Sequence, residues 1–104
     1  MKYRNIENTD IGLSLFGLGC WAFGGGDYWG SNHDQKEVNK VVHAAADLGV
    51  NYFDSAEVYN EGRSETSLGM AIKDLSRDKL IVGTKISPSH CFPGQIAQHC
   101  EASL

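Results

Sequence analysis

The sequence predicts an α/β fold in which parallel strands alternate with helices. Strand and helix patterns follow one another along the chain, and the predicted strands end near residues 19, 54 and 85. A spacing of about 30 to 35 residues is the period of right-handed βαβ units. The run at residues 80–86, Leu-Ile-Val-Gly-Thr-Lys-Ile, is almost continuously apolar, as is typical of a parallel strand buried on both faces.

The N-terminal residues predict two short strands before the first of these units. Residues 3–6 and 13–16 alternate loosely around turn signals at residues 8–10, which favours a hairpin, and the second run continues to Gly19. A long loop at residues 20–32 then holds three consecutive glycines and four aromatic side chains, Trp21, Phe23, Tyr28 and Trp29. These aromatic side chains either line a pocket or pack the loop onto the protein.

The segment from Gly17 to Ala22 matches G-x-G-x-x-A, the dinucleotide fingerprint of the Rossmann fold. That fingerprint has a physical meaning only where a helix opens at once, so that its N-terminus meets the pyrophosphate. The glycine-rich residues 23–30 cannot form this helix. The sequence therefore disfavours a Rossmann fold.

Helical periodicity marks three later segments. Residues 34–48 place Val38, Val41, Val42, Ala45 and Leu48 on one face, with Asp34 or Asn32 as the N-cap and Gly49 at the end. After a short strand at residues 50–54, a second helix at residues 64–75 carries the stripe Leu68, Ala71, Ile72 and Leu75. Pro93 suits the first turn of a last helix at residues 95–104. Three such units do not close a barrel, so the chain is either a small open domain or the N-terminal part of a larger barrel.

The composition excludes several classes of function. A net charge of −4 argues against a nucleic-acid partner, and no apolar run is long enough to cross a membrane. Three cysteines without an export signal favour reduced thiols and a cytoplasmic location. The pairs His90-Cys91 and His99-Cys100 match no zinc module, so we expect no metal site. We interpret the two cysteines as incidental thiols and the two histidines as solvent-facing or locally bonded.

Three polar residues converge on one edge of the predicted sheet. Asp54 ends the second parallel strand and Lys85 nearly ends the third, so the two should be neighbours, with Lys85 partly buried. Tyr59, on the loop after Asp54, can reach the same place. A cation beside a tyrosine lowers its pKa and suits it to proton donation. The alternative is a structural Asp–Lys bridge with a tyrosine packed over it.

These residues resemble the signature motifs of the aldo-keto reductases. Residues 53–59, Phe-Asp-Ser-Ala-Glu-Val-Tyr, followed by Gly62 and Glu65, resemble the family's central motif. Residues 17–21 and 82–85 resemble its first-strand and third-strand motifs, in the same order and at similar spacing. The resemblance covers nearly the whole chain.

The resemblance implies that residues 1–104 are the N-terminal part of a single (β/α)8 TIM-barrel domain, namely three βα units preceded by a short β-hairpin. It implies NADP(H)-dependent reduction of a small-molecule aldehyde or ketone, with Tyr59 as general acid, Lys85 as its cation and Asp54 as the partner of Lys85. Cofactor contacts would come from Gly19, Cys20, Trp21 and Asp54. The substrate itself cannot be identified from these motifs.

Two departures from the family pattern affect this interpretation. Many members have threonine in place of Cys20, and the family's catalytic histidine on the fourth strand is matched by neither His90 nor His99. We therefore expect a truncated, inactive segment. The alternatives are a nucleotide-binding barrel acting as a sensor or channel-associated subunit, and a small domain that assembles with copies of itself as a homo-oligomer.

Overall fold

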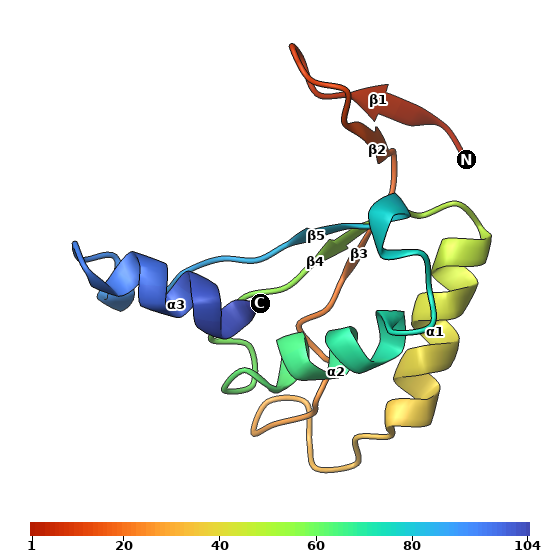
Figure 1. The fold of residues 1–104 in the computed structure, drawn as a ribbon. Helices are drawn as coiled ribbons and strands as arrows, with labels where there is room; N and C mark the ends of the chain where they lie inside the picture. The colour runs from red at the N-terminus through yellow and green to blue at the C-terminus, as the bar shows by residue number, and fades with distance from the viewer.

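The computed structural model describes all residues from 1 to 104 and contains two small sheets with helices beside them (Figure 1). β1 (Tyr3–Asn5) and β2 (Gly12–Ser14) form an antiparallel hairpin. β3 (Gly17–Gly19), β4 (Tyr52–Asp54) and β5 (Ile81–Gly83) form a parallel sheet in that order. The helices are α1 (Gln35–Asp47), α2 (Arg63–Ile72) and α3 (Gln95–Ser103), with short 3-10 turns η1 (Arg77–Lys79) and η2 (Pro88–His90). The predicted alternation of strands and helices is confirmed. None of the helices has the length and hydropathy of a membrane-spanning segment.

Two predicted strands differ in the structure. The run that ends at Gly19 divides into β2 and β3, because the chain bends at Leu15 and Phe16, where the Ser14 hydroxyl donates to the Phe16 carbonyl at 2.6 Å. The predicted strand at residues 80–86 is shorter, and β5 ends at Gly83. Lys85 therefore lies two residues beyond the strand end.

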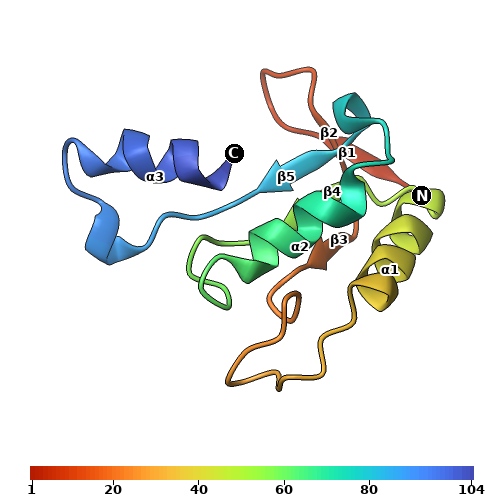
Figure 2. The ribbon, with the colours of Figure 1, turned by 60° about the horizontal axis from the view of Figure 1, so that its bottom comes forward.

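α1 and α2 cover one face of the parallel sheet (Figure 2). The core between these layers consists of Cys20, Phe23, Val38, Val42, Phe53, Leu68, Ala71 and Leu80. Complete burial of a side chain such as Phe53 contributes about 1.5 to 3 kcal/mol. Leu68, Ala71 and Ile72 of the predicted second stripe lie on α2 and pack in or against the core, while Leu75 packs against the core after α2 has ended at Ile72. Val41 and Leu48 of the predicted α1 face are 48% and 73% exposed. The buried face of α1 is thus the narrower stripe that Val38 and Val42 define.

α3 lies apart from the α1–α2 layer and buries none of its residues (Figure 1). It begins at Gln95, after Gly94 in the left-handed conformation (φ 88°). Pro93 therefore precedes the helix rather than occupying its first turn, which corrects the sequence-based prediction. The left-handed Gly94 turns the chain immediately before the helix, and Pro93 lies in that turn.

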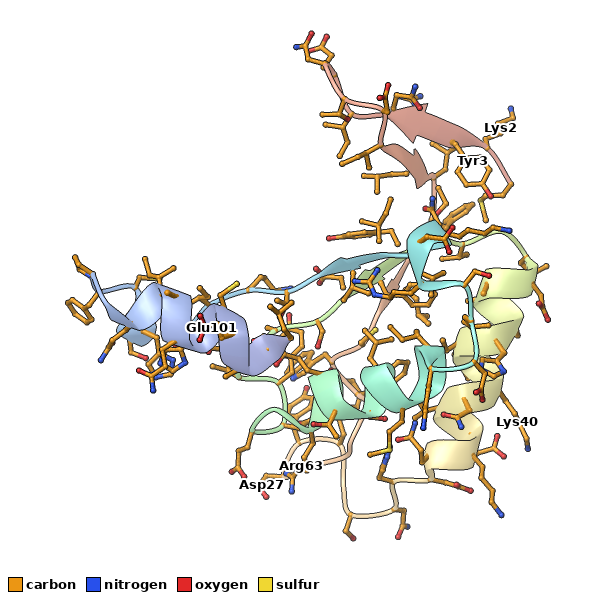
Figure 3. The ribbon with its side chains drawn as sticks, viewed as in Figure 1. Lys2, Tyr3, Asp27, Lys40, Arg63 and Glu101 are labelled. Atoms are coloured by element: carbon orange, nitrogen blue, oxygen red, sulfur yellow. The ribbon has the colours of Figure 1, made fainter.

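The hairpin packs at the amino ends of the parallel strands. Figure 3 shows Tyr3 on the hairpin at the opposite end of the molecule from Arg63, and the Tyr3 hydroxyl donates to the Gly49 carbonyl at 2.8 Å. The Asn51 side chain accepts from Ser14 N at 2.8 Å and donates to the Gly12 carbonyl at 2.7 Å. One amide thereby connects β2 to the start of β4.

We expect Asn51→Ala to lower the free energy of unfolding by about 1 to 3 kcal/mol, because it leaves polar groups of β2 without partners. Urea denaturation of the 104-residue chain measures this difference. Asn32→Ala, in an exposed loop, is the matched control. Equal stability of the two variants would show that the Asn51 side chain does not anchor the hairpin.

Candidate active site

The register of the sheet brings three strand ends to one line. Gly19 pairs with Asp54, and Asp54 pairs with Gly83. Since side chains alternate along a strand and Phe53 faces the helices, Tyr52 and Asp54 face the opposite side of the sheet. Asp54 thus stands at the carboxyl edge of the sheet between two glycines, which leave its surroundings open.

The structure brings Asp54 and Lys85 together. Lys85 Nζ donates to Asp54 Oδ2 at 2.8 Å and to the Ser55 carbonyl at 2.6 Å. Burial alone would lower the pKa of Lys85, but its interactions with Asp54 and Tyr59 outweigh that effect and raise it, so the side chain remains a cation. The two side chains are 48% and 40% exposed, which makes Lys85 more open than its apolar run suggested. A pair so exposed contributes at most about 1 kcal/mol to stability, and stability alone does not explain it.

Tyr59 completes this group. The Lys85 ammonium lies 5.0 Å from the centroid of the Tyr59 ring, within the range of a cation–π contact. The chain turns sharply just after this tyrosine, where Asn60 and Glu61 take left-handed conformations (φ 52° and 58°). The three residues singled out from the sequence therefore share one edge of the sheet, with the phenol beside the ammonium.

The glycine-rich loop is fastened to the Tyr59 loop by Asn60, a residue that the sequence analysis did not identify. Its side-chain amide donates to the carbonyls of Trp21 and Phe23 at 2.7 and 2.8 Å. Asparagine adopts a positive φ more readily than most residues, and Asn60 does so here. An asparagine in this polar turn was the feature of the sequence that could have identified the position. Asn60 thus holds the loop after β3 against the loop after β4.

The aromatic side chains of the long loop divide into two groups. Phe23 is buried in the core and packs the loop onto the protein. Trp21 stacks on Tyr28 at 5.2 Å between ring centroids and meets the edge of Trp29 at 5.3 Å. The Trp21 ring is also 6.1 Å from the Tyr59 ring. The three outer rings are 45% to 76% exposed, so they form an aromatic surface beside Tyr59.

Cys20 directly follows β3 and belongs to the hydrophobic core. Its side chain is fully buried, and burial raises the pKa of the thiol to about 12, with the nearby Asp54 charge acting in the same direction. Its main-chain N–H donates to the Asp54 carbonyl at 2.8 Å, and its carbonyl accepts from the Ser64 hydroxyl at 2.6 Å. The side chain and both main-chain groups of Cys20 thus have their surroundings within the protein, which makes Cys20 a core residue.

Tyr52 is a second residue that the sequence analysis missed. Its hydroxyl donates to Asp54 Oδ1 at 3.2 Å, while Lys85 holds the other oxygen. The ring lies between neighbouring strands, where a Cβ on Gly17 would come within 2.7 Å of its Cδ1 and a Cβ on Gly83 within 2.6 Å of its hydroxyl. The two strand glycines were the signal, because they mark a close approach of a neighbouring side chain.

A model of the Aldo/keto reductase family matches residues 16–104. The chain is similar to the NADH-specific methylglyoxal reductase of Escherichia coli (strain K12), with 41% identity over 85 residues that cover 82% of this chain and 26% of that protein. It is also similar to a probable voltage-gated potassium channel subunit beta of Arabidopsis thaliana, with 35% identity over 88 residues that cover 83% of this chain and 25% of that protein. The chain thus spans about a quarter of the length of these curated relatives.

A solved aldo-keto reductase of Klebsiella pneumoniae in complex with NADPH has the same fold, with a TM-score of 0.77 and 29% identity, over 89% of this chain and 31% of that one. This likeness identifies β3 to α3 as the first three βα units of a (β/α)8 barrel, preceded by the β1–β2 hairpin. The fold class predicted from the sequence is confirmed.

The burial of Cys20 predicts a difference in thiol reactivity. At pH 8 we expect a disulfide reagent to label the exposed Cys91 and Cys100 readily and Cys20 only on unfolding, because the thiolate is the reactive form. Mass spectrometry of the labelled peptides measures the three rates, and the two exposed thiols are the internal control. Labelling of native Cys20 at a comparable rate would contradict the core position.

The Tyr52 hydrogen bond predicts a pH-dependent difference in stability. We expect Tyr52→Phe to lower the free energy of unfolding by about 0.5 to 1.5 kcal/mol at pH 8. Burial, followed by the Asp54 charge and hydrogen bond, raises the pKa of Tyr52 above its ordinary 10.0. A raised pKa adds stability that is present below the ordinary value and lost above it. Urea denaturation at increasing pH should therefore show the gap between wild type and variant closing above pH 10, and a constant gap would contradict this account.

Proposed function

Because this chain belongs to the aldo/keto reductase family, we propose that it provides the proton-donating edge of an NADP(H)-dependent enzyme that reduces aldehydes or ketones to alcohols. The observation that carries this proposal is the position of the Lys85 ammonium, 2.8 Å from Asp54 and 5.0 Å from the centroid of the Tyr59 ring. Residues 1–104 form the N-terminal part of one barrel domain in this proposal, and the chain alone is inactive. Its residues include neither the fourth-strand histidine nor the adenosine-binding loops that the family resemblance implies.

In the proposed reaction, Tyr59 donates its hydroxyl proton to the carbonyl oxygen of the substrate as that oxygen becomes an alkoxide. The Lys85 ammonium stabilises the negative charge that then develops on the tyrosine oxygen. Asp54 and the Ser55 carbonyl hold the ammonium in place, and Tyr52 fixes the second carboxylate oxygen. The aromatic surface beside Tyr59 offers apolar contact to the substrate.

The carboxyl edge of the sheet fits a nicotinamide cofactor, which would supply the hydride when bound. Gly19 has open space where a Cβ would stand, Trp21 presents an exposed ring, and the Asp54 carboxylate is 40% exposed and can accept a hydrogen bond from a ribose hydroxyl. These three residues are our proposed cofactor contacts, without Cys20. We propose NADP(H) because the Klebsiella pneumoniae neighbour is in complex with NADPH. NADH is the alternative cofactor, since the Escherichia coli relative is named as NADH-specific.

The likeness to a plant channel subunit supports a second candidate, a barrel that binds the nucleotide and acts through a partner protein. The three polar residues at the sheet edge are compatible with both candidates, because a bound nucleotide can use the same edge without turnover. The two are separated by whether the whole protein reduces carbonyl compounds.

We expect Tyr59→Phe to lower kcat about 10²- to 10⁴-fold in the full-length protein that contains this segment, because the general acid is lost. Nucleotide binding should be unchanged. Steady-state oxidation of NADPH and of NADH with a panel of aldehydes and ketones measures the first quantity, and fluorescence titration with each nucleotide measures the second. Tyr3→Phe, on the distant hairpin, is the matched control.

Unchanged turnover in Tyr59→Phe would exclude this tyrosine as the acid. A wild-type protein that binds NADPH and reduces no member of the panel would favour the nucleotide-binding subunit instead.

A further inference from the structure

Glu57 lies on the same loop as Tyr59 and contacts the loop that carries Lys85. It follows Asp54 by three residues and precedes Tyr59 by two, and its main-chain N–H donates to the Lys85 carbonyl at 3.1 Å. Two residues earlier, Ser55 N donates to the Gly83 carbonyl at 2.8 Å. The pairing between β4 and β5 therefore continues past the strand ends and ends at Glu57.

The Glu57 side chain extends this connection to two further elements. Its Oε1 accepts from Ser87 N and from His90 Nδ1, both at 2.7 Å, and its Oε2 lies 2.9 Å from His99 Nδ1 of α3. The carboxylate is only 11% exposed. The Ser87 amide, followed by His90, holds the pKa of Glu57 below its ordinary 4.5, so the group is charged at neutral pH. Because a carboxylate only accepts, His90 Nδ1 must carry a hydrogen.

Glu57, His90 and His99 also have the composition of a metal site, since imidazole and carboxylate are common ligands of zinc. Their ligand atoms lie within 4.8 Å of one another. However, the His90 and His99 rings are stacked at 3.9 Å with only 6° between their planes. An imidazole lone pair lies in the plane of its ring, so two stacked rings direct their lone pairs along parallel lines rather than to one ion. The geometry favours a carboxylate held by the Ser87 amide and the His90 ring, with the His99 ring stacked on that of His90.

We propose that Glu57 is a positioning residue that fixes the Tyr59 loop against the Lys85 loop, with Ser87 and His90 as its donors and His99 beside its second oxygen. This inference rests on the proposed function, in which the phenol must lie beside the ammonium. Asn60 fastens the other side of the same loop to the segment after β3. Tyr59 is thus held from both neighbouring strands, and charged hydrogen bonds of this kind are among the strongest available to a loop.

The first test uses the 104-residue chain and does not depend on catalysis. In Glu57→Ala we expect amide hydrogen exchange at Ser87 and at residues 55–59 to become about ten- to hundredfold faster, because Ser87 N loses its acceptor. Glu57→Gln, which keeps one acceptor oxygen, should give a smaller increase. Glu37→Ala, which removes an exposed carboxylate paired with Lys40, is the matched control. If Glu57→Ala does not fold, Glu57→Gln is compared with Glu37→Gln. Exchange no faster than in the matching control would overturn the proposal.

The second test uses the full-length protein. We expect Glu57→Ala to lower kcat about ten- to hundredfold with little change in nucleotide affinity, because a misplaced loop moves the acid and not the cofactor contacts. If Tyr59→Phe abolishes reduction while Glu57→Ala retains full kcat, the positioning role is wrong and the proposed function stands. If Tyr59→Phe leaves reduction unchanged, the proposed function is wrong, and exchange at Ser87 alone decides whether Glu57 connects the two loops.

Discussion

The parallel pairing of β4 with β3 on one side and β5 on the other is the constraint on which the site depends. Its register sets Gly19, Asp54 and Gly83 on one line, so the loops that leave the three strands begin side by side. The strands have only three residues each, and their hydrogen bonds alone would hold them weakly. The apolar layer of α1 and α2 stabilises the pairing, with Phe53 of the central strand buried beneath it.

The loops beyond the strand ends are held by a different kind of interaction. Packing of apolar side chains fixes the sheet and the two helices, whereas single polar side chains connect the loops: Asn60 between the first two and Glu57 between the last two. Each of these side chains makes several bonds at once. The position of Tyr59 is therefore determined by hydrogen-bond geometry, which is directional, rather than by burial, which is not.

The sequence was most informative where a pattern reports a local property. The order of strands and helices, the α2 stripe and the meeting of Asp54 with Lys85 follow from periodicity and from the rules of parallel sheets. It was least informative where one backbone angle or a distant partner decides the outcome. The bend at Leu15 and the left-handed Gly94 lie within otherwise regular patterns. The bonds that hold Cys20 and the side chain of Glu57 come from residues 30 or more positions away, which no local pattern can report.

The ring of Tyr52 lies in a space that exists only because both neighbouring strands carry glycine, at positions 17 and 83. The residue types allowed at these three positions therefore depend on one another, although the positions are widely separated in the sequence. A larger residue on either flank requires a smaller one at position 52, and the second donor to Asp54 would then be lost. Among related chains we therefore expect the side-chain sizes at these three positions to vary together, with tyrosine at position 52 where positions 17 and 83 are both glycine.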